Sequence, residues 1–248
     1  MDTTADRRGR PSHADTGTMD GQDNLAASFS QFARSVQQQA DPEETLAEIV
    51  RAAVALIPGC DDGSISVVAG RRAVNSHAPS SEFARVIDTL QDSLGQGPCL
   101  DAAYDHETVR VADMAAETRW PRFIEAARAA GAAGVLSIQL FVDGDNLGAL
   151  NLFSRTPGAF DDESEHVGLM FAAHAAVAFA ATQQQAAMNR AVATRQLIGQ
   201  AQGVLMERHK LTSDQAFALL VRVSQHRKTE LRDIAASLVQ SGRFAMPE

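Results

Sequence analysis

Residues 195–239 read RQLIGQAQGVLMERHKLTSDQAFALLVRVSQHRKTELRDIAASLV, and this stretch decides the fold of the C-terminal part of the chain. Apolar residues recur at helical spacing in three segments, which predicts three short amphipathic helices. The second segment begins at Thr212, and Gln215 three residues later completes the pattern of a capping box. The third follows Thr229 and carries a narrow apolar stripe. Three such helices with tight links predict a small all-α bundle.

The same residues, in order and spacing, resemble the ANTAR domain, a three-helix output module of bacterial regulators. The matching positions are Ile198, Ala201, Gly203, Leu205, Met206, Ala216, Phe217, Leu220, Ser224, Gln225, Leu231, Arg232, Asp233, Ile234 and Ala235. The resemblance implies binding of RNA at hairpin loops in transcript leaders, control of transcription termination, and a homodimer. Two positions depart from the family pattern. Lys228 stands where Asn is common, and Glu230 stands where Lys is common and places a negative charge where a phosphate could be met.

The charge of the chain is unevenly distributed. The whole chain has a formal net charge of −9, yet residues 182–248 contain nine Lys and Arg against five Asp and Glu, a net charge of +4. A basic segment in an otherwise acidic chain is the distribution that binding of RNA phosphates requires. Ordinary solvated helix faces would give the same balance, so composition alone leaves both interpretations open.

Nine polar and basic side chains in this segment are the predicted RNA contacts, because guanidinium groups pair with phosphates and stack on unpaired bases. They are Arg195, Arg208, Lys210, Arg222, Gln225, His226, Arg227, Lys228 and Arg232. The segment has no Tyr or Trp, and Phe217 is expected in the core, so stacking of bases on aromatic rings is not expected. The alternative for each residue is a place on a solvated basic surface.

The preceding part of the chain mixes helical and extended patterns. Asp41-Pro42-Glu43-Glu44 marks a helix start, with Asp at the cap and Pro at the first position. Helices are expected near 25–36, 42–57, 82–94 and 120–130 and from residue 160 onward, and strands at 64–69, 73–77, 108–111, 135–142 and 147–153. Strand pairs with intervening helices predict an α+β fold, an antiparallel sheet flanked by helices.

Residues 41–181 resemble a GAF domain, a bacterial sensory fold, and are closest to the GAF domains ahead of ANTAR modules in actinobacterial regulators. The resemblance lies in LGQGPCLDAA (94–103), RWPRF (119–123), VLSIQLFVDGDNLGALNLFS (135–154) and FDDES (160–164). The expected organisation is a disordered tail over residues 1–23, which carry few large apolar side chains, a GAF-like sensory domain over 24–181, and an ANTAR-like RNA-binding domain over 182–248.

The GAF resemblance implies a small-molecule ligand but names none, and a filled core used only for dimerisation stays open. The cyclic-nucleotide signature is absent, because Leu152 rather than Lys follows Asn151. His77 and His106 could ligate haem, although loop histidines are more often surface residues. Cys99 is either a redox-sensing thiol or a buried structural thiol. No cofactor and no metal site is predicted.

Catalytic residues are not expected either. The chain has no phosphate-cradling glycine loop, no metal-ligand spacing and no nucleophile elbow. The acidic pairs at 61–62 and 161–162 are interpreted as turn and capping residues. Two cysteines make no disulfide framework, no apolar leader is present, and no apolar run is long enough to span a bilayer. A cytoplasmic location is therefore expected.

The stretch that joins the two expected domains, residues 182–187, contains neither Pro nor Gly, so one helix is expected to continue through it. The positions Ala187, Ala191, Thr194, Ile198, Ala201 and Leu205 follow the 4-3 spacing of a coiled-coil seam or of a plain intramolecular face. The sequence therefore predicts a signal-responsive, RNA-binding regulator of transcription termination. The alternative is a sensory protein that binds no RNA and acts through dimerisation and protein contacts.

Overall fold

A computed structural model describes residues 17–39, 41–69, 73–104, 107–142 and 145–242 of the chain. The chain divides into two compact units, Met1–Thr182 and Gln183–Glu248, and each is described by itself. The first unit contains α1 (Gly17–Gln37), α2 (Pro42–Leu56), α3 (Glu82–Leu94), α4 (Pro98–Tyr104), α5 (Pro121–Ala129) and the first part of α6 (Asp162–His209). Its strands are β1 (Asp62–Ala69), β2 (Ala73–His77), β3 (Thr108–Val111), β4 (Gly134–Val142) and β5 (Asp145–Ser154).

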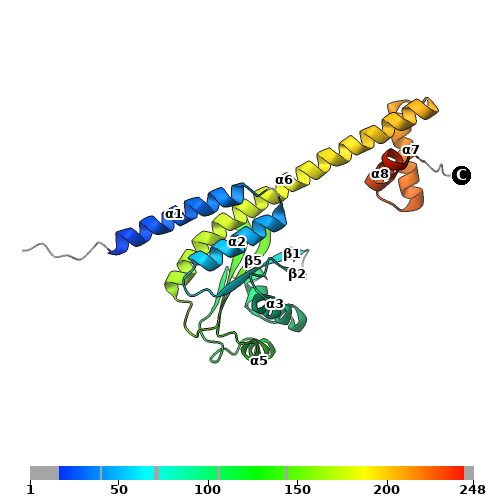
Figure 1. The fold of residues 1–248 in the computed structure, drawn as a ribbon. Helices are drawn as coiled ribbons and strands as arrows, with labels where there is room; N and C mark the ends of the chain where they lie inside the picture. Colours follow the sequence, from blue (N-terminus) through cyan, green and yellow to red (C-terminus); the bar gives the residue numbers. More distant parts are fainter. Residues whose placement is uncertain (1–16, 40, 70–72, 105–106, 143–144, 243–248) are drawn as a thin grey trace, which may run out of the picture. The chain divides into compact units, whose positions relative to one another are not determined.

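These five strands form one antiparallel sheet in the order β2-β1-β5-β4-β3 (Figure 1). The expected α+β fold is thereby confirmed. Alternate residues of each strand point to opposite faces of the sheet, and both faces are covered by helices. On one face Ile65, Ile138 and Leu150 pack with α1, α2 and the first part of α6. On the other, Val109, Val135 and Phe153 pack with α3, α4 and α5.

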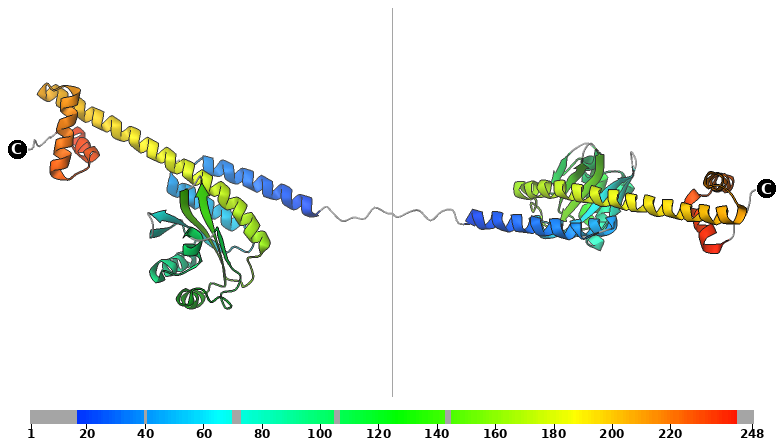
Figure 2. Two further views of the ribbon diagram at one scale, coloured as in Figure 1. Left: turned by 180° about the vertical axis from the view of Figure 1, so that it is seen from behind. Right: turned by 90° about the horizontal axis from the view of Figure 1, so that it is seen from above.

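Aromatic side chains fasten α1 to the first part of α6. The ring of Phe32 lies 4.4 Å from that of Phe171, and the ring of Phe29 lies 6.1 Å from it, both measured between centroids. Both views of Figure 2 show α1 beside this part of α6. The expected tail over residues 1–23 is wrong for residues 17–23, which are helical, while residues 1–16 lie outside the described residues. The packed residues Phe29 and Phe32 anchor the C-terminal half of α1. Once a helix is anchored, each residue added at its end gains one backbone hydrogen bond, so the helix can extend through the polar residues 17–23.

Local signals fix the ends of several helices. Asp41 accepts hydrogen bonds from the backbone N–H of Glu43 and Glu44 at 2.8 and 3.3 Å, as its cap pattern predicted. Gly95 ends α3 in the left-handed conformation. The helix α4 was not predicted from the sequence, because a proline after a glycine ordinarily marks the end of a helix. Proline is also favoured at the first position of a helix, and Pro98 begins α4 in that role.

The second unit contains the rest of α6, then α7 (Ser213–Arg227) and α8 (Leu231–Ser241). Nine buried residues form its core: Ala201, Leu205, Ala216, Leu219, Leu220, Val223, Ile234, Ala235 and Leu238. The predicted capping box is present, because the Thr212 hydroxyl accepts from the Gln215 N–H and the Gln215 side chain accepts from the Thr212 N–H. The helix through residues 182–187 is continuous, as expected.

The six-residue seam on α6 is only partly free. Ala201 and Leu205 are buried in the core of the bundle, so the last two positions belong to an intramolecular face. Ala187 and Ala191 are exposed, and Thr194 and Ile198 are half-buried. A coiled-coil seam over all six positions is therefore excluded, because two of them already pack against α7 and α8 within one chain.

Candidate functional site

All nine predicted RNA contacts are exposed in the second unit. Two of them are already engaged. The Arg208 guanidinium donates to the carbonyl oxygen of Gly242, the residue that ends α8, so this side chain holds the end of α8 against α6. Lys210 Nζ lies 3.3 Å from Glu207 Oε1 in an exposed pair. Arg208 therefore has a structural role, and its guanidinium group is less available to bind a phosphate than those of the other arginines.

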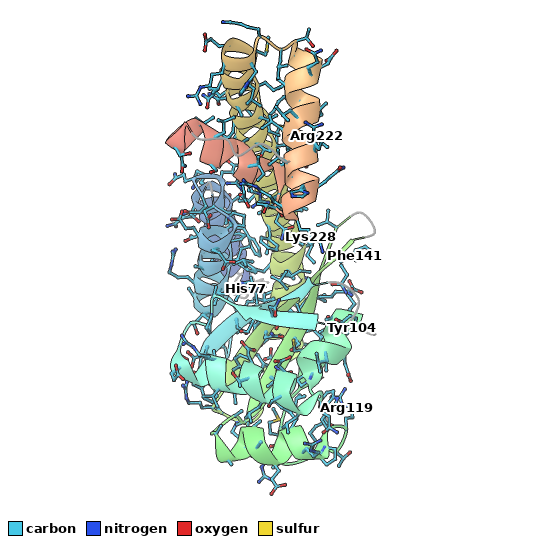
Figure 3. The ribbon with its side chains drawn as sticks, turned by 90° about the vertical axis from the view of Figure 1, so that its right-hand side faces the viewer. His77, Tyr104, Arg119, Phe141, Arg222 and Lys228 are labelled. Atoms are coloured by element: carbon cyan, nitrogen blue, oxygen red, sulfur yellow. The ribbon has the colours of Figure 1, made fainter. Side chains whose placement is uncertain are left out.

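The remaining basic side chains are free of such partners. Arg195, Arg222, Arg227, Lys228 and Arg232 form no ion pair with any residue that the structure describes. Figure 3 shows Arg222 on α7 and Lys228 at the end of the same helix. Arg227 and Lys228 lie at the C-terminal end of α7, where cations interact favourably with the helix dipole even without a ligand.

The two departures from the family pattern have backbone explanations. Lys228 ends α7 in the left-handed conformation, with a φ of 51°, and Asn is among the few residues that adopt it readily. Glu230 is the cap residue of α8, where a negative charge faces the positive end of the helix dipole. Both positions therefore serve helix ends, and neither departure by itself argues against RNA binding.

A groove between α6 and α7 brings together residues that the sequence did not group. Its volume is about 520 Å³, and it is lined by Arg190, Ala191, Thr194, Arg195, Ile198 and Gln202 of α6 and by Phe217 of α7. The expectation that Phe217 lies in the core is wrong, because 42% of its surface is exposed. Ala216, Leu219, Leu220 and Val223 fill the core instead, and Phe217 stands at the edge of their stripe.

Of the nine predicted contacts only Arg195 lines this groove. Arg222 follows Phe217 by five residues, which places it roughly 140° away around the helix. Arg190 was missed, although it lines the groove together with Arg195. It lies five residues before Arg195, roughly 140° away around α6, so no helical spacing in the sequence groups the two arginines.

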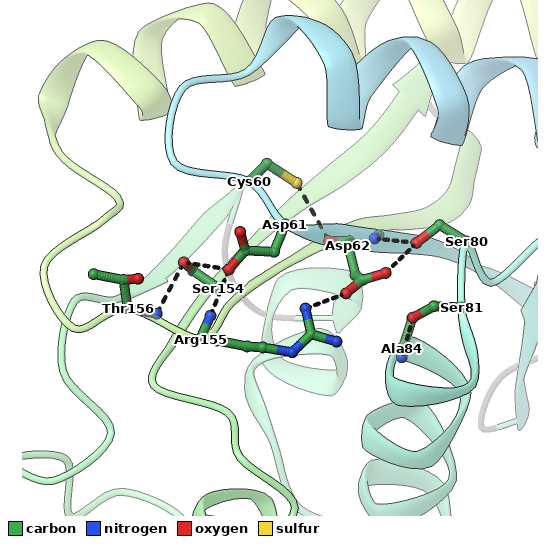
Figure 4. A network of polar contacts seen from close by, with 10 residues as sticks. Cys60, Asp61, Asp62, Ser80, Ser81, Ala84, Ser154, Arg155 and Thr156 are labelled. Carbon is green, nitrogen blue, oxygen red and sulfur yellow. Dashed lines mark hydrogen bonds and ion pairs between the residues drawn. The ribbon is translucent and has the colours of Figure 1, made fainter.

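The acidic pairs of the first unit have structural roles, and Figure 4 shows the first pair, Asp61 and Asp62. Asp61 accepts from the Ser154 hydroxyl at 3.1 Å and from the Arg155 N–H at 2.7 Å. Asp62 pairs with Arg155 at 2.7 Å. Burial opposes ionisation of Asp62, but hydrogen bonds from Ser81, Arg155 and Ser80 hold its pKa below the ordinary value. These contacts fasten the start of β1 to the end of β5.

The second acidic pair begins α6. Asp161 accepts from the N–H of Ser164 at 2.9 Å, the usual contact of a helix cap. Asp162 pairs with Arg110 of β3 at 2.8 Å. The interpretation as a capping residue is confirmed for Asp161, whereas Asp62 is the first residue of β1 and serves as the partner of Arg155.

Both cysteine thiols stay protonated at neutral pH. Burial raises the pKa of Cys60 and of Cys99 to about 12. The Cys99 thiol donates to the Ser66 hydroxyl at 3.0 Å, and the residue is buried. A redox-sensing thiol needs thiolate character and access, so of the two interpretations of Cys99 the structure supports the buried structural thiol.

One of the two histidines considered for haem lies within the described residues. His77 Nδ1 lies 3.1 Å from Glu43 Oε1, an exposed contact between the end of β2 and α2. His106 lies outside the described residues. Within the described part of the chain, no group of three or more His, Cys, Asp or Glu side chains could hold a metal ion.

Polar side chains cross one face of the sheet, where a core would ordinarily be apolar. Ser137 of β4, Asn151 of β5 and Ser64 of β1 are neighbours in register, and all three are buried. The Ser137 hydroxyl donates to Asn151 Oδ1 at 3.0 Å, and Asn151 Nδ2 donates to Ser66 at 2.8 Å. This polar row lies beneath α3 and α4. The row could not be predicted from the sequence, because only the strand register brings these residues together.

The described helices include none that is long and apolar enough to cross a bilayer. No curated protein matches the chain significantly.

Solved structures share the fold of the first unit. The GAF domain of a phosphoenolpyruvate-protein phosphotransferase from Coxiella burnetii is 19% identical, with a TM-score of 0.51 over 66% of this chain and 97% of that one. The free methionine-R-sulfoxide reductase from Neisseria meningitidis is 19% identical, with a TM-score of 0.52 over 70% of this chain and 95% of that one. At this level of identity the likeness concerns the fold alone.

Family models account for both units. The model of the GAF domain matches residues 39–180, and the model of the ANTAR domain matches residues 186–239. The first match covers more than half of the chain and contains the whole five-stranded sheet. The second contains α7 and most of α8. The chain therefore belongs to the GAF family and carries an ANTAR domain after the GAF domain.

Proposed function

We propose that this GAF–ANTAR regulator is an antiterminator: its GAF domain senses a signal, and its ANTAR domain binds RNA hairpins and thereby controls transcription termination. The two domain matches support a signal-responsive regulator in general. The observation that carries the proposal further is the groove between α6 and α7, where Arg190, Arg195 and the exposed ring of Phe217 line one concave surface.

The groove has the chemistry that an unpaired RNA base requires. Bases splayed from a hairpin loop stack on aromatic rings, while guanidinium groups contact the adjacent phosphates. Phe217 supplies the ring, and Arg190 and Arg195 of α6 line the same groove. Gln202 also lines the groove, and its Nε2 donates to the carbonyl oxygen of Ser213 at 3.2 Å and to the Ser213 hydroxyl at 3.3 Å. Its own side-chain carbonyl remains an acceptor.

Replacing Phe217 by leucine is expected to weaken the binding of a small-loop RNA hairpin about tenfold to a hundredfold, because a stacked base contributes about 1–3 kcal/mol. Replacing Arg190 and Arg195 together by alanine should weaken binding and also lower the slope of log K against log salt by about 1.4, as expected for two lost phosphate contacts. Titration of the full chain with labelled RNA at several salt concentrations measures both effects, with a scrambled loop as the RNA control.

Matched variants separate this groove from the rest of the basic surface. Arg34→Ala removes an exposed arginine of α1 and should leave RNA binding unchanged. Arg227→Ala with Lys228→Asn removes the basic end of α7 and keeps a residue that tolerates the left-handed backbone. If only this last pair abolishes binding, the RNA lies at the end of α7 and not in the groove. If the parent protein binds no hairpin, the protein-interaction alternative replaces the RNA proposal.

A homodimer is part of the proposal, and α6 supplies the surface for it. From residue 183 to residue 200, all of them described, no side chain is buried. Met188 and Val192 lie one turn apart and are 58% and 61% exposed. An isolated helical stretch of this length is marginal in water unless an apolar face is covered. A second copy of the same stretch would cover it.

Replacing Met188 and Val192 together by glutamate is expected to convert the dimer to a monomer, because the charges would oppose each other across a symmetric contact. Light scattering coupled to size exclusion gives the mass of parent and variant. Glutamate at Gln183 and Ala193, which lie roughly 100–180° around the helix from Met188 and Val192, is the control for added charge. A parent protein that is monomeric at micromolar concentration would reject the dimer.

The proposal assigns no catalytic step and no cofactor to this chain. The protein-interaction alternative rests on the same exposed stretch of α6, since that surface could take a different protein as well as a second copy. RNA titration distinguishes the two functions directly.

A further inference from the structure

The polar row of the GAF sheet surrounds a buried carboxylate. Asp88 of α3 is 5% exposed, and its two oxygens accept from the hydroxyls of Ser64, at 3.0 Å, and Ser76. Both donors are neutral. No Lys, Arg or His among the described residues forms an ion pair with Asp88. A carboxylate in such a place is unstable as an ion unless a positive charge reaches it, and burial accordingly raises its pKa to about 6.

A buried amide lies one turn further along α3, and only its oxygen has a hydrogen-bond partner. Gln91 is 2% exposed, and its Oε1 accepts from the backbone N–H of Cys99 at 2.8 Å. This bond fixes the orientation of the amide, because only the oxygen can accept from an N–H. The amide nitrogen Nε2 is then a buried donor that no described group accepts from. Such a donor is rare in a native protein and points to an acceptor from outside the chain.

A cavity of about 140 Å³ lies against both groups. It is lined by Ser66 and Ser76 of the sheet, by Asp88 and Gln91 of α3 and by Cys99 of α4, among others. Gly97 preserves it, since a Cβ there would lie 2.6 Å from Gln91 Oε1 and would displace that side chain. The cavity is far smaller than the ~300–1,000 Å³ of pockets for drug-sized ligands, so a nucleotide or a haem is too large for it.

We propose that this cavity is the sensory site of the GAF domain and binds a small organic cation, whose ammonium group pairs with Asp88 and whose neutral oxygen accepts from Gln91 Nε2. The serine hydroxyls and Asn75 would complete the contacts of the ammonium group. The inference rests on the proposed function, because it names the class of signal that the regulator senses. Anionic ligands are excluded by Asp88 together with Asp92 at the rim of the same cavity.

Calorimetric titration of the full chain tests the inference with a pair of probes of equal size. The amino alcohol 3-aminopropan-1-ol carries an ammonium group and a hydroxyl, while propane-1,3-diol replaces the ammonium group by a second hydroxyl. The amino alcohol is expected to bind at millimolar concentrations and the diol at least about tenfold more weakly, because only the former neutralises Asp88.

The variant Asp88→Asn should abolish this preference, with thermal unfolding used to show that the variant is folded. The variant Glu82→Gln, which removes an exposed carboxylate from the same helix, should keep the preference. Three results would overturn the inference: no binding of the amino alcohol, equal binding of both probes, or an unchanged preference in Asp88→Asn. Hairpin titration of the same samples keeps the two proposals apart, since RNA binding without amine binding rejects the ligand class alone.

Discussion

Replacing Gly148 by alanine is expected to lower the unfolding free energy of the GAF domain by about 3 kcal/mol or more, a large part of the roughly 5–15 kcal/mol that stabilises an ordinary domain. Gly148 of β5 has a φ of 141°, which side chains other than glycine rarely adopt. An added Cβ would lie 1.8 Å from the carbonyl oxygen of Ser66 on the neighbouring strand β1. Backbone strain of about 1–3 kcal/mol therefore combines with the separation of two central strands. Urea unfolding followed by circular dichroism measures the loss.

Gly158→Ala is the matched control for this substitution. Gly158 has a φ of 71°, so the strain of a left-handed backbone is present there, but no atom lies within 4 Å of the added Cβ. Its expected cost is about 1–2 kcal/mol. If Gly148→Ala and Gly158→Ala lower the unfolding free energy equally, the contact of the added Cβ with Ser66 has no energetic effect.

Replacing Asp88 by asparagine is expected to stabilise the protein at high pH and to change little at low pH. The folded-state pKa of Asp88 is raised from 3.8 to about 6 by burial, against which the hydrogen bonds from Ser76 and Ser64 act. The folded state therefore binds the proton more tightly than the unfolded state. The stability that protonated Asp88 contributes is fully present below a pH of about 4 and is lost as pH rises through about 6. The loss is on the order of 3 kcal/mol above that window, and asparagine cannot ionise.

Chemical unfolding at about pH 4 and about pH 8 checks this expectation, with the window taken from the pKa of Asp88. The parent protein should lose stability between the two conditions by more than the variant does. Asp92→Asn, at an exposed position of the same helix, controls for the removal of one negative charge. Parallel pH profiles of the parent protein and Asp88→Asn would contradict a buried, ionisable Asp88.

The helix ends and the strands could be predicted because their signals are local. Asp41, Thr212 and Gln215 make the cap contacts that their spacing predicts, and all the strand cores lie where alternation placed them. The side of a helix that faces the core was harder to predict. In α3 the polar residues Asp88 and Gln91 are buried, whereas the apolar Val86 is partly exposed. Hydrophobic periodicity cannot reveal a buried polar site, because it ranks such residues as solvent-facing.

The RNA-binding residues were predicted by charge, and charge does not distinguish a free arginine from an engaged one. Arg195 and Arg208 look alike in the sequence, but Arg208 holds the carbonyl of Gly242, 34 positions along the chain. Similarly, Phe217 fits the apolar period of α7 to within one position and was placed in the core on that basis. Only the packing of α6 against α7 shows that its ring stands at the rim of a groove.

Gly97 also bears on how such a sensor could change its specificity. The space beside Gln91 exists only because residue 97 lacks a side chain. Gly97 also has a φ of 143°, which residues other than glycine rarely adopt, so position 97 is expected to stay glycine among related sensors. Position 91 is then the one that can vary, and a shorter residue there would enlarge the cavity and admit a different signal.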